Sequence, residues 1–228
     1  MVMDRPGEAL AFSFRQGAIA LLLSCLLLAA RAATAAEPAG GVDLAGSRVY
    51  AFVPKKGLGH DHAIEGTLSA GQVRLGAAEA AGRLVFDMRS FRADGPQARK
   101  LLRLAGETDA GTRKQVDDNM LGPAVLDVDR HPTATFEIRS ALPSAKPAAA
   151  GKTAWELSGS FTLHGVTRPL TVRAEAEAAG PVERLWGSFT IKQTDFGIKP
   201  FSKLGGVVGI ADELTIYGDI RVAAGAPR

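Results

Sequence analysis

Histidines are the residues of this chain whose types and spacing could do chemistry. His60 and His62 are one residue apart, so in an extended strand both imidazoles would lie on one face and could be presented to a single metal ion. A third ligand would have to come from elsewhere in the chain, the candidates being Asp61, Asp87, His131 and His164. Structural zinc sites take four ligands, so the pair fits a hydrogen-bonding role near a turn equally well. We therefore predict no metal or other cofactor and keep metal binding as an alternative.

The other two histidines are interpreted as structural. His164 precedes Gly165 in a short turn between two strand-like segments, where an imidazole can bond a nearby carbonyl group. His131 precedes Pro132, which restricts it to an extended backbone and favours the opening of a strand.

Covalent catalysis has no support in the sequence. There is no Gly-x-Ser-x-Gly elbow, and the single cysteine, Cys25, lies near the N-terminus. Residues 205–209 are rich in glycine, but no Gly-Lys-Ser/Thr follows them, so they predict a flexible loop and no phosphate site. We expect a protein that is not an enzyme.

The first 35 residues are predicted to be a targeting segment. Arg5 and Arg15 precede an apolar stretch at 17–30, and Ala-Thr-Ala at 33–35 resembles a cleavage site. The apolar stretch is shorter than the ~20 residues of a membrane-spanning helix. We expect cleavage near Ala35 and a periplasmic or secreted protein without a stable membrane span. Lipid attachment at Cys25 is a less favoured alternative, because the residues after it stay apolar.

The remaining chain is predicted to hold one domain. Composition indicates a flexible leader at 36–46, a folded domain at 47–223 and a short tail at 224–228. The formal net charge of the whole chain is +3, without a cluster of basic residues, which excludes a nucleic-acid-binding surface.

Apolar and polar residues alternate in eight segments, which predicts eight β-strands. They lie at 49–53, 63–68, 83–90, 134–140, 155–164, 170–178, 185–193 and 214–222. Helical signal is confined to the middle of the chain. A short helix is expected at 97–104, and a second around Thr112 and Gln115, whose spacing is that of a capping box, before Gly122 and Pro123.

Alternation alone allows a sandwich or a barrel, and closure would remove exposed strand edges. Gly159, Gly187 and Gly218 each interrupt an apolar face. A glycine at such a place either bends the strand or leaves space for a ligand. Both interpretations remain open at this point.

Three segments carry a family resemblance. They are Phe-Thr-Leu-His-Gly-Val-Thr-Arg-Pro at 161–169, His-Pro-Thr-Ala-Thr-Phe at 131–136 and Asp-Phe-Gly-Ile at 195–198. In this order they resemble the YceI-like family, and the likeness extends over about 47–222. The resemblance implies an all-β, eight-stranded antiparallel, lipocalin-like barrel that encloses a long apolar ligand such as a polyisoprenoid lipid.

The predicted ligand-binding residues are those expected to face the barrel interior or its end. They are Phe86, Met88, Phe136, Ile138, Trp155, Gly159, Phe161, Leu163, Gly187, Phe189, Ile191, Phe196, Phe201 and Ile216. The alternatives are a filled barrel that serves as a scaffold without a ligand, and a protein that binds metal through His60 and His62. The oligomeric state stays open, a dimer included.

Overall fold

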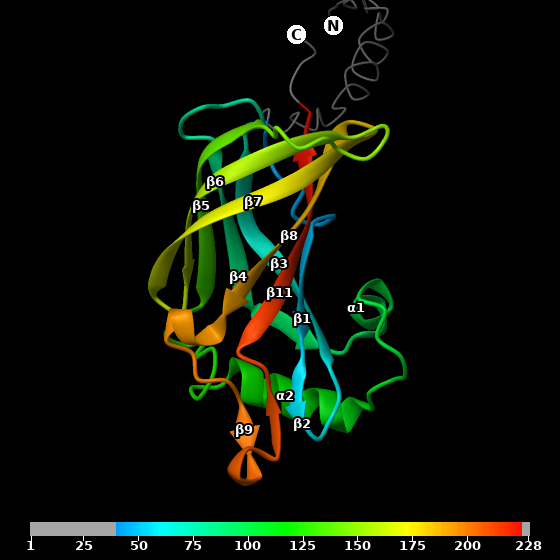
Figure 1. Cartoon of the computed structure of the whole chain (residues 1–228), viewed down its shortest axis with the longest axis vertical. Coiled ribbons are helices and arrows are strands. Elements are labelled where there is room, and N and C mark those ends of the chain that lie inside the picture. Colours follow the sequence, from blue (N-terminus) through cyan, green and yellow to red (C-terminus); the bar gives the residue numbers. More distant parts are fainter. Residues whose placement is uncertain (1–39, 225–228) are drawn as a thin grey trace, which may run out of the picture. The chain divides into compact units, whose positions relative to one another are not determined.

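Eight long strands close into an antiparallel barrel in the computed structural model, which describes residues 40–224 (Figure 1). The strands are β1 (Arg48–Val53), β3 (His62–Val73), β4 (Gly82–Ala93), β5 (Thr133–Pro143), β6 (Thr153–Leu163), β7 (Val166–Ala179), β8 (Val182–Lys192) and β11 (Glu213–Ala223). Their order around the barrel is β1-β11-β8-β7-β6-β5-β4-β3. The predicted fold class and all eight predicted strands are confirmed. The predicted targeting segment, with Cys25 and the cleavage position, lies outside the described residues.

The barrel closes between its first strand and its last. In β1, Ala51 pairs with Ile216 of β11 on one side and with Ile64 of β3 on the other. On the outer face, the guanidinium of Arg184 in β8 donates two hydrogen bonds to the carboxylate of Asp219 in β11, at 2.6 and 2.7 Å. Such a bidentate ion pair fixes the register of the two strands.

Residues 40–46 differ from the expected flexible leader. Val42 is buried in the core and pairs with Val222, and Gly41 pairs with Gln72. This segment therefore covers one end of the barrel between β3 and β11. Composition gave no sign of this, because a single buried valine among glycine and alanine has no periodic pattern.

Two helices lie between β4 and β5: α1 (Pro96–Leu101) and α2 (Ala110–Leu121). The N-cap of α2 is Asp109, whose carboxylate accepts a hydrogen bond from the backbone N–H of Thr112 at 3.0 Å. The predicted capping box from Thr112 to Gln115 is therefore not the start of the helix. None of the residues of α2 is fully buried, and the helix runs across one end of the barrel (Figure 1).

A small sheet at the same end as α2 was not predicted. It has the order β2-β10-β9, formed by β2 (Lys55–Gly57), β10 (Val208–Ile210) and β9 (Ser202–Lys203). Its strands have two or three residues, too few for alternation to be detected. The loop predicted at 205–209 is thus a short 3₁₀ turn, η2 (Leu204–Gly206), followed by a strand. Another 3₁₀ turn, η1 (Gln193–Phe196), follows β8.

Within residues 40–224, no helix is both long and apolar enough to cross a membrane.

Candidate functional site, an apolar cavity inside the barrel

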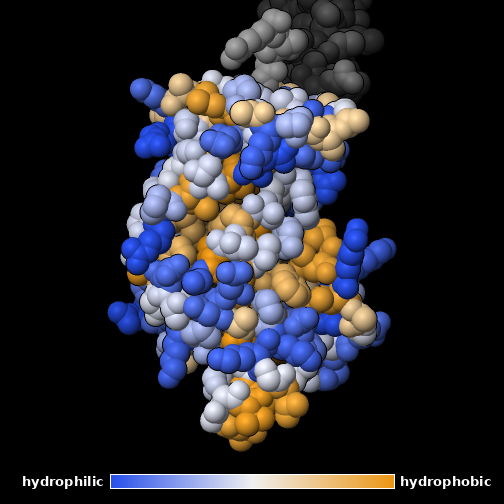
Figure 2. Space-filling model, in the orientation of Figure 1, coloured by the Kyte–Doolittle hydropathy of each residue, from blue (hydrophilic) through white to orange (hydrophobic). Residues whose placement is uncertain are grey.

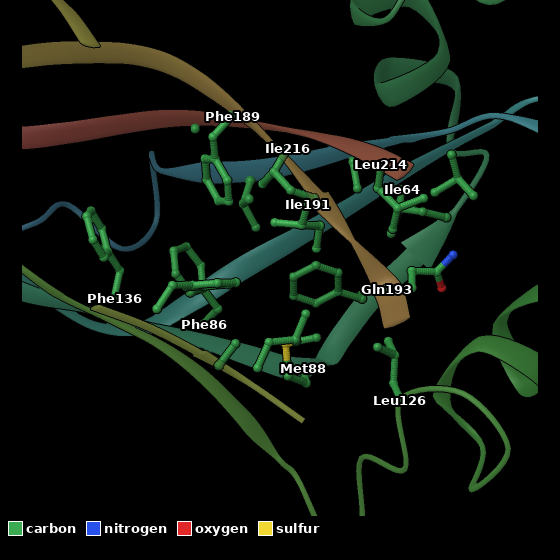
Figure 3. A pocket seen from close by; sticks show the side chains of 18 of the residues that line it. Ile64, Phe86, Met88, Leu126, Phe136, Phe189, Ile191, Gln193, Leu214 and Ile216 are labelled. Atoms are coloured by element: carbon green, nitrogen blue, oxygen red, sulfur yellow. The ribbon is translucent and has the colours of Figure 1, made fainter. Parts of the chain in front are cut away.

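An apolar cavity of about 230 Å³ lies inside the barrel (Figure 3). Each of the eight barrel strands contributes to its wall, because every second residue of a strand points inward. For comparison, a cavity of about 150 Å³ lined by Leu, Ile and Phe in another protein is dry and binds benzene. A wall of this composition has few groups that could hold water, and it suits an apolar guest.

The two ends of the cavity differ in polarity. The middle and the end away from α2 are lined by hydrocarbon side chains such as Phe136, Phe189 and Leu185. The α2 end contains three polar side chains, His62, Asn119 and Gln193. Figure 3 shows Phe136 at one end of the cavity and Gln193 beside Leu126 at the other. An amphiphile would therefore place its polar group at the α2 end.

Ten of the predicted ligand-binding residues line this cavity. They are Phe86, Met88, Phe136, Phe161, Leu163, Gly187, Phe189, Ile191, Phe201 and Ile216. Their positions follow from alternation in β4, β5, β6, β8 and β11, except for Phe201, which precedes β9. Their role in ligand binding remains a prediction.

Ile138, Trp155, Gly159 and Phe196 do not line the cavity. Ile138 and Phe196 are buried in the surrounding core, and Trp155 packs against it. The ring of Phe196 meets the ring of Phe161 edge-on, with centroids 5.7 Å apart. Phe196 thus packs against Phe161 on the side away from the cavity and stabilises this part of the wall.

The three glycines of the apolar faces have different roles. A Cβ at Gly159 would collide with the carbonyl oxygen of Glu137, so this glycine permits the close approach of β5 and β6. The contact lies next to the β-bulge between Ile138 and Ser140. Gly187 and Gly218 line the cavity and lie opposite each other on β8 and β11.

Gly218 is the glycine that leaves space. A Cβ there would meet only the Cγ1 atom of Ile220, at 3.6 Å. A Cβ at Gly187 would lie 2.9 Å from the carbonyl oxygen of Arg173. Of the two interpretations left open, the bend applies to Gly159, which was also among the predicted ligand-binding residues but does not line the cavity, and the space applies to Gly218.

Helix α2 supplies lining residues that the sequence analysis missed. Val116, Asn119 and Met120 face the cavity from the helix, and Leu126 does so from the loop after it. The spacing of Val116 and Met120 by four residues indicated a common face. Nothing in the sequence indicated that this face covers a barrel.

The strands β7 and β8 are hydrogen-bonded along only part of their length. These strands pair only from Ala174 with Gly187 to Ala179 with Val182, so their other halves, residues 166–173 and 188–192, diverge. Leu170 and Phe189 line the cavity beside this divergence, and both are partly exposed. The barrel thus has a place at its side where a guest could approach the interior.

His60 and His62 converge on Asp94, which follows β4. Their rings are 4.5 Å apart, and the Asp94 Oδ2 atom lies 2.7 Å from His62 Nδ1 and 3.3 Å from His60 Nε2. These three ligand atoms lie within 4.8 Å of one another, so they form a possible metal-binding group. The third member is thus Asp94, which was not among the four candidates considered from the sequence.

The Asp94 carboxylate also has partners of its own. Its Oδ1 atom accepts hydrogen bonds from the Ala63 backbone N–H at 3.0 Å and from Arg99 Nη1 at 2.9 Å. Burial acts to raise the pKa of Asp94, but the hydrogen bonds from His62, Ala63 and Arg99 outweigh it and lower that pKa well below its usual range. The carboxylate is therefore ionised and satisfied by protein donors alone, which favours a structural role that holds α1 against β3 and β4.

His131 and His164 lie together, apart from that cluster. Their rings are 4.4 Å apart, and His164 Nδ1 donates a hydrogen bond to the Phe196 carbonyl oxygen at 3.3 Å. His164 adopts a positive φ of 51° before Gly165, as a tight hairpin turn requires. His164 thus links the turn after β6 to η1, and the ring of His131 packs beside it.

Curated relatives match part of the chain. A UPF0312 protein of Pseudomonas aeruginosa strain LESB58 is 35% identical over 91 residues, which are 36% of this chain and 43% of the relative. A UPF0312 protein of Azotobacter vinelandii is 29% identical over 119 residues, which are 48% of this chain and 58% of the relative. The matched regions thus span about half the length of these relatives.

Solved structures share the fold. BcnA of Burkholderia cenocepacia superposes with a TM-score of 0.54 at 22% identity, covering 80% of this chain and 99% of BcnA. A polyisoprenoid binding domain from Saccharophagus degradans, described as implicated in plant cell wall breakdown, has a TM-score of 0.50 at 15% identity. That match covers 82% of this chain and 100% of the other. At these identities the likeness concerns the fold alone.

The family model of the YceI-like domain matches residues 42–222, from the buried Val42 before β1 to its pairing partner Val222 in β11. The chain therefore belongs to the YceI-like domain family.

Proposed function

We propose that this protein is a non-enzymatic carrier that holds a long apolar chain, of the polyisoprenoid class, inside its barrel. The observation that carries the proposal is the cavity of about 230 Å³, whose wall is apolar along its length and polar only at the α2 end. The polyisoprenoid binding domain from Saccharophagus degradans, which has the same fold, supports the choice of ligand class.

Solvent exclusion would supply the affinity. Each methylene group removed from water contributes about 0.8 kcal/mol before the cost of ordering the ligand. A linear chain of about a dozen carbons could thus bind tightly without a specific polar contact. The polar group of an amphiphile would lie near His62, Asn119 and Gln193, where it avoids burial among hydrocarbon.

Export to the periplasm, or secretion, is part of this proposal. It rests on the predicted targeting segment at 1–35. Fractionation of cells that express the full chain, together with the mass of the protein found outside the cytoplasm, tests both export and cleavage near Ala35.

Native mass spectrometry of the protein purified from the extracytoplasmic fraction is the first test of the carrier. We expect one apolar adduct per chain, which solvent extraction releases and identifies. A protein without an adduct that also fails to take up added isoprenoid alcohols would overturn the carrier and favour the filled-barrel scaffold.

The cluster of His60, His62 and Asp94 supports a second candidate, metal binding. Elemental analysis of the same preparation tests it. Stoichiometric zinc that is lost on replacing both histidines by alanine would support a metal protein, whereas metal-free protein that takes up no added zinc would end that alternative.

A further inference from the structure

An exposed apolar tip lies beyond the α2 end of the barrel. It consists of Leu58, Leu204 and Val207, which are 67%, 78% and 50% exposed. The backbone holds them together, since the Leu58 N–H donates to the Val207 carbonyl oxygen at 2.9 Å and Val207 follows η2, which begins at Leu204. Figure 2 shows the apolar surface gathered at the lower tip of the molecule. Grouped exposure of this kind is unusual for a monomer surface and marks an interaction site.

Leu204 combines an exposed side chain with an unfavourable backbone conformation. Its φ is +51°, a left-handed value that a leucine rarely adopts, and Gly205 and Gly206 follow with φ of 67° and 99°. A bulky residue in this region costs free energy that nothing at the tip offsets by burial. Burial of the Leu204 side chain against another molecule would offset this cost.

The charge around the tip points to the partner. The two segments that form it, 54–60 and 196–211, contain four lysines, and their acidic neighbours, Asp61, Asp195 and Asp212, lie directly beyond the segment ends. Lys55, Lys56, Lys199 and Lys203 are all exposed. Exposed apolar side chains that lie in the same two segments as exposed lysines match a bilayer whose anionic headgroups lie above its acyl chains.

The tip adjoins the wall of the cavity. Phe201 and Ile210, which line the cavity, both belong to the tip segment 196–211, and the Ile210 N–H donates to the Phe201 carbonyl oxygen at 3.1 Å. Figure 1 shows β2 at the level of α2 and β9 beyond it, at the end where the cavity carries its polar groups. A lipid that leaves a membrane at this tip would thus start next to the α2 end of the cavity.

We infer that the tip formed by Leu58, Leu204 and Val207 inserts into the surface of an anionic phospholipid bilayer, with Lys55, Lys56, Lys199 and Lys203 on the headgroups. That lipid is exchanged there rests on the carrier function proposed above. Docking itself needs no ligand in the cavity, so it can be tested alone.

The test uses the chain from Ala36, which contains every contact of the described fold and no cysteine. Circular dichroism and a thermal unfolding transition first establish that each variant is folded. Flotation with phosphatidylcholine vesicles containing phosphatidylglycerol then measures docking, and vesicles of phosphatidylcholine alone report the charge requirement. We expect binding to the anionic vesicles that weakens as salt is added.

Variants separate the apolar and the electrostatic parts. Leu58→Ser, Leu204→Ser and Val207→Ser combined should reduce partitioning at least about tenfold. Lys55→Gln, Lys56→Gln and Lys203→Gln should each weaken binding to anionic vesicles about fivefold. The matched control is Leu142→Ser, because Leu142 is an exposed leucine, 41% accessible, at the end of β5. This control should bind as the unchanged chain does.

A single label reports which end inserts. A polarity-sensitive fluorophore on Leu204→Cys should shift to the blue with anionic vesicles, and the same label on Leu142→Cys should not. Failure of the unchanged chain to float, equal binding by the triple serine variant, or equal shifts from both labels would each overturn membrane docking. Gly218→Leu, designed to fill the cavity, should still dock, so loss of the carrier function and loss of docking are distinguishable.

Discussion

At the scale of single residues, the capacity of the cavity depends on one glycine in its wall. Gly218 lies among Leu214, Ile216 and Ile220 on the inward face of β11, and it is the position where an added side chain meets the fewest atoms. The effect of filling it can therefore be separated from damage to the fold.

We predict that Gly218→Leu lowers the affinity for a fluorescent isoprenoid probe at least about tenfold, because the leucine occupies space that the ligand needs. Probe titration measures the affinity, and thermal unfolding should show a folded protein. Thr215→Leu, on the same strand but outside the cavity lining, is the matched control and should bind normally. Undiminished affinity in folded Gly218→Leu would contradict the cavity as the ligand site.

Gly159 leads to the opposite prediction. Gly159→Ala should destabilise the barrel by about 1–3 kcal/mol, since its Cβ would collide with the Glu137 carbonyl oxygen and force β5 and β6 apart. Urea unfolding measures this, and probe affinity in the folded fraction should be nearly unchanged. A variant as stable as the unchanged chain would show that the bulge can relax.

Asp94 is the buried charge on which the entry to β3 depends. Its side chain is fully buried, and that of Arg99 is 8% exposed. We predict that Asp94→Asn lowers the free energy of unfolding at neutral pH by about 3 kcal/mol, because the guanidinium of Arg99 then loses its anionic partner. Urea unfolding measures the change. Asp118→Asn, which removes the exposed pair with Lys114, should cost less than about 1 kcal/mol.

The same variant has a pH signature. The pKa of Asp94 is lowered in the folded state, so its contribution is present above the unfolded pKa of about 4 and is lost as pH falls below that value. The unchanged chain should thus lose stability more steeply than Asp94→Asn below about pH 4. If the free energy of unfolding fell equally steeply with pH in the two proteins, Asp94 would gain no stabilising partners on folding.

At the scale of elements, α2 is the part of the cavity wall with the weakest attachment. It has no fully buried residue, and one of its ties to the barrel is the hydrogen bond from the Ala93 N–H to Asp117 Oδ1, at 2.7 Å. By contrast, β6 and β8 are each hydrogen-bonded to a neighbouring strand along their whole length. An element with few buried contacts opens at lower free energy than the fold as a whole.

We predict that the amides of α2 exchange hydrogen faster than those of β6, and that a bound isoprenoid slows exchange in α2 more than in β6. The physical reason is that Val116 and Met120 gain apolar contacts when the cavity is filled. Hydrogen–deuterium exchange with mass spectrometry compares the two segments with and without ligand. Equal protection of α2 in both states would assign ligand entry to the divergent halves of β7 and β8 instead.

Elements also show how far sequence reasoning extends. The eight barrel strands were predictable because their apolar and polar residues alternate with a period of two, and nine of the ten lining residues followed from that period, all but Phe201. The role of α2 as a cover, the partner of His60 and His62, and the short strands of the tip were not. Asp94 is 32 residues from His62 in sequence, and a contact of this kind depends on the backbone path, which residue spacing does not fix.

At the scale of the whole molecule, the closed barrel couples the folding equilibrium to the binding of a ligand. A ligand that binds only the folded chain adds RT ln(1 + [L]/Kd) to the free energy of unfolding, about 2.7 kcal/mol at a hundredfold excess over Kd. The cavity is the centre of the main core, so such a ligand is lost when the barrel opens.

The closing pair of strands, β1 and β11, joins residues 48–53 to residues 213–223 across nearly the full described chain. Before β11 has been synthesised the barrel cannot close, so its interior has no complete wall that could enclose a lipid. Under the proposed carrier function, synthesis and export would therefore handle an empty, open polypeptide, and the ligand would be acquired in the compartment where the chain finishes folding. The order of the strands would then determine where in the cell the first lipid is loaded.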